Sequence, residues 1–172
     1  DAKKLIKSKI NNNKKIIFIG SSMGSWIALN LFDFFKKKLI GFIGIASAPE
    51  FLERLMWKKF SKKIKKELMS KNIYRLDHGG FIYPLTHQLI LDGKKNKIFD
   101  KKIKLSIPII LFHGSNDKVV PVNFSKKILK IVKKSKKKLI IINKGDHSLS
   151  RKKDLSKICK ELKNIVEKFK YD

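Results

Sequence analysis

The sequence predicts an α/β fold, in which a parallel sheet of about four strands is flanked by helices. Four short apolar runs have the length and composition of buried strands; they cover 15–20, 38–46, 107–113 and 138–143. The segment after the third run predicts an amphipathic helix, because its apolar residues recur at helical spacing opposite lysines. Strands that alternate with helices along the chain are typical of parallel sheets covered by helices.

A glycine-serine turn joins the first strand to the next helix. The letters GSSMG at 20–24 match G-x-S-x-G, with Ser22 at the centre. This pattern is typical of a nucleophile elbow, a strained strand-to-helix turn that presents a serine hydroxyl. We expect Gly20 and Gly24 to remove collisions that side chains would cause there. The alternative is an ordinary tight turn that happens to hold two serines.

A serine nucleophile needs an imidazole to take its proton and a carboxylate to orient that imidazole. Asp117 lies in a loop directly after the third predicted strand, where an orienting acid is expected. Asp146 is a weaker candidate, since it adjoins a histidine but points away from it in an extended loop. Asp92 and Asp100 lie in a stretch that does not follow a strand. We therefore predict Asp117 as the acid.

His147 follows the fourth predicted strand, 30 residues after Asp117 (147 − 117). That interval holds one helix and one strand, so both side chains reach the same edge of a parallel sheet. His113 closes the third strand and is expected to pack or hydrogen-bond beneath the site. His78 and His87 lie in the long segment between strands, where surface or pocket positions are usual. We predict His147 as the general base.

With these residues identified, the chain resembles the α/β-hydrolase superfamily. The likeness is to bacterial esterases related to the mitochondrial palmitoyl-protein thioesterase and mycophenolic acid acyl-glucuronide esterase. The matching stretches are IGSSMGSWIALNL (19–31), GIASAPEFLERLMW (44–57), YPLTHQLILDGKKN (83–96), LFHGSNDKVVP (111–121) and GDHSLSRKKDL (145–155). The resemblance implies a serine esterase or thioesterase with Ser22, Asp117 and His147 as its triad. Ser25 departs from the glycine frequent in this branch.

The resemblance also implies an oxyanion hole, one of whose donors is the backbone N–H of Met23. The second donor comes from a loop among earlier strands, and no such strands precede Ser22 in this sequence. We therefore expect the chain to be an N-terminally truncated part of the fold, with its first strand left as an exposed apolar edge. We expect the 172-residue chain alone to be inactive or nearly so.

A long insertion, residues 47–104, separates the second and third predicted strands within a single domain, 1–172. Helical stretches are expected at 50–56, 61–70 and 86–92, and Gly79-Gly80 is a candidate hinge. The resemblance implies that this insertion is a cap over the nucleophile. Its apolar residues line an acyl pocket or pack the cap; the pocket candidates are Met56, Trp57 and Tyr83.

Composition limits the remaining classes of function. The formal charge is +28, yet only three basic residues are arginines, the residue type best suited to phosphate and base recognition. We therefore expect no specific nucleic-acid partner; lysines on solvated helix faces account for the charge. No apolar run is long enough to span a bilayer, and we expect a cytoplasmic protein with a small-molecule acyl ester or thioester substrate. The oligomeric state stays open.

The single cysteine, Cys159, is expected in the core, on the apolar face of the last helix with Ile158, Leu162, Ile165 and Phe169. No cluster of histidine, cysteine and acids has metal-ligand spacing, so we expect neither metal nor cofactor. Two other classes of function stay open. One is a catalytically inactive α/β-hydrolase-like binding domain, and the other is a basic protein that associates with nucleic acid.

Overall fold

The computed structural model describes all residues except 12, 13, 79 and 172. The chain divides into two compact units, each described by itself. Unit 1 comprises residues 1–49 and 99–172, and unit 2 comprises residues 50–98. Gly79 of the expected hinge lies outside the described residues. Whether unit 2 is a cap, and whether the whole is one domain, stay predictions.

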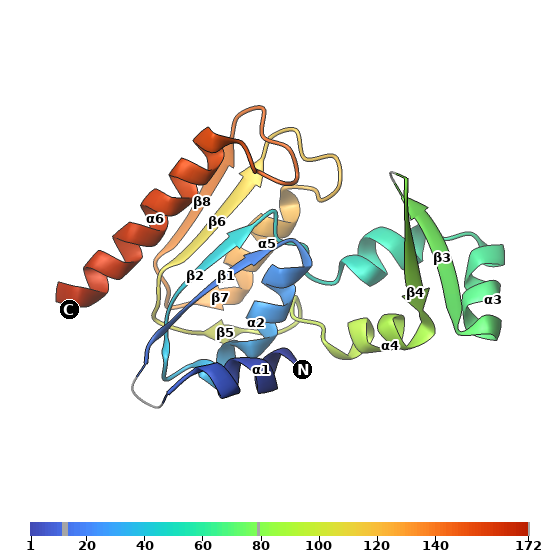
Figure 1. Ribbon diagram of the computed structural model, residues 1–172, viewed down its shortest axis with the longest axis horizontal. Helices are drawn as coiled ribbons and strands as arrows, with labels where there is room; N and C mark the ends of the chain where they lie inside the picture. Colours follow the sequence, from blue (N-terminus) through green and yellow to red (C-terminus); the bar gives the residue numbers. More distant parts are fainter. Residues whose placement is uncertain (12–13, 79, 172) are drawn as a thin grey trace. The chain divides into compact units, whose positions relative to one another are not determined.

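Unit 1 contains a four-stranded parallel sheet in the order β1-β2-β6-β8 (Figure 1). The four strands are β1 (Ile16–Ser21), β2 (Leu39–Ile45), β6 (Ile109–Gly114) and β8 (Lys137–Ile142). The helices of this unit are α1 (Ala2–Lys9), α2 (Met23–Phe35), α5 (Asn123–Ile131) and α6 (Lys152–Tyr171). A second, two-stranded parallel pair joins β5 (Ile103–Lys104) to β7 (Val132–Lys133). The predicted parallel α/β fold is confirmed.

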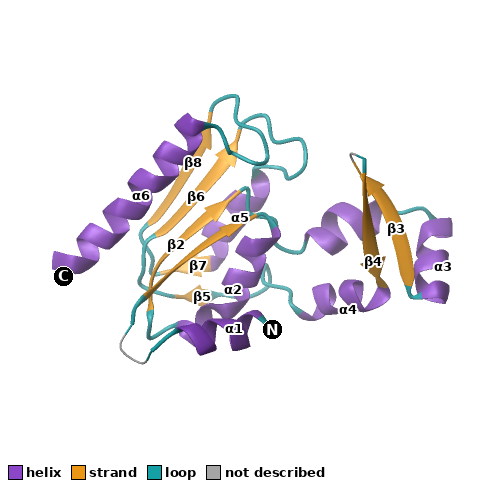
Figure 2. Ribbon diagram, in the orientation of Figure 1, coloured by secondary structure: helices purple, strands orange, loops and turns teal. Residues whose placement is uncertain are grey.

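Helices cover both faces of the sheet, as the alternation of side chains in β2 demonstrates (Figure 2). The ring of Phe42 lies 5.1 Å from that of Phe32 in α2, edge to face. The adjacent residue, Ile43, belongs to the cluster that contains Ile158 and Ile165 of α6. Successive strand residues point to opposite faces, so α2 and α6 lie on opposite sides of the sheet. The side chains of Phe42 and Ile43 are both fully buried.

Strand β1 forms one end of the sheet and pairs with β2. Among the described residues no strand pairs with its other side, and Ile19 in this strand is half exposed. This position agrees with the exposed apolar edge expected from the sequence.

Unit 2 corrects the expectation of a helical insertion, because an antiparallel hairpin lies between its helices (Figure 2). Its elements are a π-helical turn (Leu52–Met56), a 3₁₀ turn (Trp57–Lys59), α3 (Lys62–Lys71), β3 (Ile73–His78), β4 (Phe81–Thr86) and α4 (His87–Lys95). Pro84 lies within β4, opposite Arg75. A proline is compatible with a strand that has only one partner, since its missing N–H can face away from the ladder.

The two ends of unit 2 are joined by a buried carboxylate. Glu50, its first residue, is 1% exposed and has a φ of 57°. Its Oε1 accepts a hydrogen bond of 2.9 Å from the backbone N–H of Ile98, the last residue of the unit. Its Oε2 pairs with Arg54 Nε at 2.8 Å. A charged partner on one oxygen and a backbone N–H on the other offset the cost of burying this carboxylate.

The last helix, α6, corrects the expectation for Cys159, which is exposed. The buried face of α6 instead follows Asp154, Ile158 and Ile165. Residues one position apart lie about 100° around a helix, so Cys159 is turned away from the sheet although Ile158 is buried. Phe169 is also exposed.

Among the described residues, no helix has the length and apolar character needed to cross a bilayer.

Candidate active site

Three sequence-predicted residues lie at the carboxyl ends of the parallel strands. Ser22 follows β1, Asp117 follows β6 and His147 follows β8. Loops at this edge of a parallel sheet meet in space, because all four strands end there. The structure brings the three side chains together.

Ser22 lies in the sharp turn between β1 and α2, with φ of 50° and ψ of −116°. This backbone conformation is strained for any residue other than glycine and is characteristic of a nucleophile elbow. The turn is fixed by contacts with the chain after β2. The N–H of Ser22 donates to the carbonyl of Ile45 at 2.8 Å, and the N–H of Ala48 donates to the carbonyl of Ser22 at 3.2 Å. The hydroxyl of the fully buried Ser25 donates to the carbonyl of Gly20.

The two glycines of the turn differ in the space around them. A Cβ on Gly20 would lie 2.6 Å from the backbone nitrogen of Ser25 and 2.7 Å from the carbonyl carbon of Gly24. Apart from its chain neighbours and the nearby backbone of its own helix, a Cβ on Gly24 would meet no described atom within 4 Å. The expectation that both glycines avoid a collision is therefore wrong for Gly24. Its side-chain position points away from the turn, whereas that of Gly20 points into it.

This difference gives a testable contrast. We expect Gly20→Ala to lower the rate of any reaction at Ser22 by about 10²-fold, because the backbone of the turn has to move and misplaces the hydroxyl. Gly24→Ala is expected to keep that rate and to raise the free energy of unfolding by about 0.5 to 1 kcal/mol, the usual gain for replacing a helical glycine. Covalent labelling rates and thermal unfolding of both variants check the pair. Equal rates in the two variants would contradict it.

Asp117 is held in the loop after β6 by the backbone that follows it. Its Oδ1 accepts hydrogen bonds from the N–H groups of Val119 at 2.8 Å and Val120 at 2.9 Å. Its side chain is 1% exposed. The second oxygen, Oδ2, lies 2.8 Å from His147 Nδ1. The loop thus fixes one oxygen of the carboxylate and directs the other toward the imidazole.

His147 completes the chain of hydrogen bonds. Its Nε2 lies 3.1 Å from Ser22 Oγ, across 125 residues of sequence. Because the Asp117 carboxylate is an acceptor, Nδ1 donates to it, and in the neutral ring Nε2 is left to accept from the serine hydroxyl. The side chain of His147 is 25% exposed, so its imidazole is accessible from solvent. This arrangement can remove a proton from Ser22 and return it.

The loops that carry Asp117 and His147 are tied directly to each other. The N–H of Asn116 donates to the carbonyl of Gly145 at 2.8 Å, and Ser115 Oγ accepts from the N–H of Lys144 at 2.8 Å. A Cβ on Gly114 would collide with carbonyl oxygens of the histidine loop. The absence of a side chain at Gly114 is what lets the two loops approach closely.

An arginine anchors the histidine loop to α6. Arg151 donates from Nε and Nη2 to the carboxylate of Asp154, at 2.6 and 3.1 Å, and from Nη1 to the carbonyl of Lys144 at 2.7 Å. The hydrogen bond with Asp154 raises the pKa of Arg151 above its ordinary value. Arg151 therefore keeps its positive charge, and the loop that carries His147 is closed at both ends.

The remaining candidates fall outside this cluster or in the other unit. Met23 is the first residue of α2, where helical N–H groups have no acceptor within the helix. Its part in an oxyanion hole stays a prediction. The pocket candidates Met56, Trp57 and Tyr83 belong to unit 2, and their role stays a prediction too. Asp146 caps its own loop instead, since its Oδ1 accepts from the N–H of Leu149.

Sequence reasoning did not identify a contact between Asp117 and His113. This residue is fully buried, and its Nε2 lies 3.3 Å from Asp117 Oδ2. The sequence indicated that His113 packs or hydrogen-bonds beneath the site, but not which group it contacts. The path of the loop between them decides that contact, and residue spacing does not reveal it.

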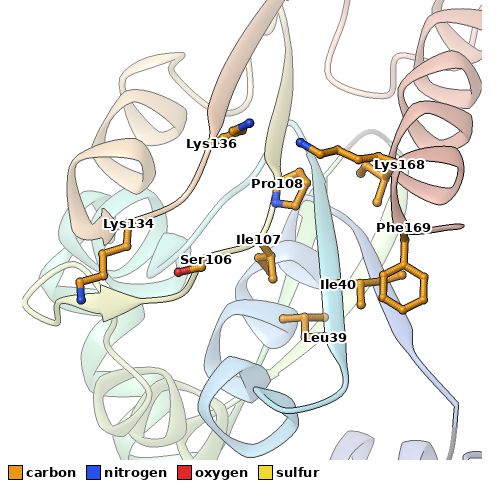
Figure 3. A pocket seen from close by; sticks show the side chains of 10 residues that line it. Leu39, Ile40, Ser106, Ile107, Pro108, Lys134, Lys136, Lys168 and Phe169 are labelled. Carbon is orange, nitrogen blue, oxygen red and sulfur yellow. The ribbon is translucent and has the colours of Figure 1, made fainter. Parts of the chain in front are cut away.

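A hollow of about 380 Å³ lies at the opposite, amino-terminal edge of the sheet (Figure 3). Its lining residues are Leu39, Ile40, Ser106, Ile107, Pro108, Lys134, Lys136, Ile165, Lys168 and Phe169. Three of these ten are lysines, a share close to that of basic residues in the whole chain, 42 of 172. The lysines therefore do not mark this hollow as an anion site, and it lies apart from Ser22.

The chain is similar to known hydrolases, which agrees with the arrangement of Ser22, Asp117 and His147. A family model described as Serine aminopeptidase, S33, of the Hydrolase_4 type, matches residues 78–154. The human mitochondrial palmitoyl-protein thioesterase ABHD10 is 24% identical over 157 residues, covering 88% of this chain and 50% of that protein. The chain thus spans about half the length of the thioesterases that it matches.

Two further likenesses extend this comparison. The pimeloyl-[acyl-carrier protein] methyl ester esterase of Wigglesworthia glossinidia brevipalpis is 27% identical, over 91% of this chain and 71% of that protein. The solved structure of mouse alpha/beta hydrolase domain-containing protein 10 superposes with a TM-score of 0.82 at 23% identity, over 96% of this chain and 68% of that one. At this identity the superposition establishes the fold.

Proposed function

We propose that this chain, an α/β hydrolase by its fold and by its resemblance to known members, is a serine hydrolase that cleaves carboxylic esters or acyl thioesters. The observation that carries the proposal is the pair of hydrogen bonds made by His147, one to Ser22 Oγ at 3.1 Å and one to Asp117 Oδ2 at 2.8 Å. A serine, an imidazole and a carboxylate in this order make up the machinery of acyl transfer.

In the first half of the reaction, Ser22 Oγ attacks the carbonyl carbon of the substrate while His147 Nε2 takes the hydroxyl proton. Asp117 keeps His147 Nδ1 protonated and stabilises the imidazolium that forms. The tetrahedral intermediate then collapses. The bond from the carbonyl carbon to the leaving oxygen or sulfur breaks, and the leaving group takes the proton from His147 Nε2. The acyl group stays on Ser22.

In the second half, water attacks the acyl-enzyme and gives a proton to His147 Nε2. Collapse of this intermediate breaks the bond to Ser22 Oγ, which recovers the proton, and the carboxylic acid leaves. The developing oxyanion needs hydrogen-bond donors in both halves. We assign one of them to the backbone N–H of Met23, the first residue of α2. The positive end of the α2 dipole lies at the same place and favours negative charge there.

The resemblances support an acyl substrate but leave its leaving group open, since one relative is named a thioesterase and another an ester esterase. We include in the proposal that unit 2 is the cap and that Met56, Trp57 and Tyr83 contact the acyl chain. None of these side chains is fully buried within the chain. They are therefore available for contact with a substrate.

The experiments that test this proposal use the full-length protein that the host cell synthesises. A fluorophosphonate probe should form an adduct that mass spectrometry maps to Ser22, while the neighbouring Ser21 stays unmodified. A panel of short and long acyl p-nitrophenyl esters and acyl thioesters should then give a burst of about one product per protein, the sign of an acyl-enzyme. Absence of both adduct and turnover would favour a binding domain with this fold. Retention of the protein on heparin, without an adduct and without turnover, would favour association with nucleic acid.

A further inference from the structure

A second histidine lies against the acid of the proposed triad. His113, near the end of β6, is fully buried. Its Nε2 lies 2.9 Å from the carbonyl oxygen of Val120 and 3.3 Å from Asp117 Oδ2. Its Nδ1 lies 2.9 Å from the hydroxyl of Ser125, a fully buried residue of α5. Every polar atom of this imidazole therefore faces a specific partner.

The partners of His113 assign its tautomer. Both groups that face Nε2, a carbonyl and a carboxylate, are acceptors, so Nε2 carries a proton. In the neutral ring Nδ1 is then an acceptor, and the Ser125 hydroxyl donates to it. The Nε2 proton is donated to the Val120 carbonyl at 2.9 Å, and the Asp117 carboxylate lies 3.3 Å from the same nitrogen.

The carboxylate of Asp117 is surrounded by donors on both oxygens. Oδ1 accepts from two backbone N–H groups, and Oδ2 faces His147 Nδ1 and His113 Nε2. Three hydrogen bonds and the close approach of His113 Nε2 leave this carboxylate little freedom to rotate, since a carboxylate has about four acceptor sites. The two imidazoles approach Oδ2 from different elements, β6 and the loop after β8.

We propose that His113, held by Ser125, is a positioning residue that keeps the Asp117 carboxylate aimed at His147. This inference rests on the proposed function and extends the machinery from three residues to five. The order is Ser125, His113, Asp117, His147 and Ser22. His113 acts only through Asp117, and it makes no contact with a substrate in this account.

A role in packing alone does not account for these contacts. The four residues before His113 in β6 are all apolar and buried, and a phenylalanine or leucine fills comparable space without a polar group to desolvate. Burial of an imidazole is unfavourable unless its nitrogens are hydrogen-bonded. His113 differs from an apolar side chain of similar size by its N–H at Nε2. A test therefore has to separate the effect of losing this N–H from the effect of changing the side-chain volume.

Three substitutions make this separation. The amide nitrogen of a glutamine reaches the place of Nε2, whereas that of an asparagine reaches only the place of Nδ1, and phenylalanine keeps the ring without nitrogen. We expect His113→Gln to keep kcat within about threefold. His113→Asn and His113→Phe are expected to lower kcat by about 10²-fold with KM unchanged, because a displaced acid misorients the base. Ile128→Ala on the same helix as Ser125 is the control for lost stability, with kcat retained.

A second readout does not depend on activity. The Nδ1 proton that His147 shares with Asp117 gives a downfield NMR resonance, which should shift in His113→Asn and His113→Phe but not in His113→Gln or Ile128→Ala. If wild-type protein neither labels nor turns over, the proposed function fails, and this resonance still tests the contact. Should no variant of His113 fold, Ser125→Ala is expected to lower kcat roughly fivefold, the effect of one lost hydrogen bond.

The inference is overturned by a folded His113→Phe that keeps both kcat and the resonance, or by a His113→Gln that loses as much as His113→Phe. In the second case ring volume, and not the donor at Nε2, is what the site requires. An unchanged kcat and resonance in Ser125→Ala would likewise remove Ser125 from the account.

Discussion

Replacing Ser22 with alanine is expected to lower kcat/KM for ester or thioester hydrolysis by about 10⁶-fold, the scale on which serine hydrolases lose activity with their nucleophile. Alanine has no oxygen for the acyl group, whereas Asp117 and His147 keep their own hydrogen bond. Initial rates with p-nitrophenyl esters, together with fluorophosphonate labelling, measure the loss. The backbone at position 22 already has a positive φ of 50°, so the variant inherits the strain of the wild type and is expected to fold.

The control for this variant is Ser21→Ala. Ser21 is the last residue of β1 and is exposed, so it has the same chemistry one position away and no imidazole beside it. We expect its kcat/KM to stay within about threefold of wild type, the usual effect of a surface substitution. A reversed result, with Ser21→Ala inactive and Ser22→Ala active, would show that the nucleophile was assigned to the wrong serine.

The sheet and the three residues at its edge could be predicted because their signals are local. Each strand is a continuous apolar run, and the glycine pattern around Ser22 reflects the sterics of a single turn. The order of acid and base follows from loops that end neighbouring parallel strands. The structure places these strands within about two residues of the expected bounds.

The hairpin of unit 2 was missed although its sequence carries a signal. Two runs rich in β-branched and aromatic residues flank Gly79-Gly80, a pair typical of hairpin turns. Pro84 in the second run weakens that signal, because proline is excluded from the interior of most sheets. It is accommodated here because β4 pairs only with β3 among the described strands. The number of partners that a strand has is a tertiary property, and the local sequence does not contain it.

The errors at Cys159 and Gly24 have a related cause. Each position was assigned from its spacing, but what decides the outcome is the direction of one side chain. At Cys159 that direction differs by about 100° from the buried Ile158, and at Gly24 it leads into open space. A pattern of residue types identifies the buried face of a helix reliably. It does not decide whether a residue at the edge of that face is buried or exposed.

The second large effect is expected at the acid. Asp117→Asn should lower kcat by about 10⁴-fold, because the amide is forced into the wrong orientation. Two backbone N–H groups donate to Oδ1, so the amide carbonyl takes that place and the NH₂ group faces His147. A donor then opposes a donor. His147 has to move its proton from Nδ1 to Nε2, where it faces Ser22, and the base is lost.

Asp146→Asn provides the matched control for that change. Asp146 adjoins His147 in sequence, and its Oδ1 accepts from the N–H of Leu149, a role that an amide carbonyl also fulfils. We therefore expect its kcat to stay within about threefold of wild type, and steady-state kinetics of the two variants give the comparison. If Asp117→Asn kept kcat within tenfold while Asp146→Asn lost it, Asp146 would be the orienting acid. In that event the hydrogen bond of 2.8 Å between Asp117 and His147 would be structural, and the five-residue chain that begins at Ser125 would end before it reached the base.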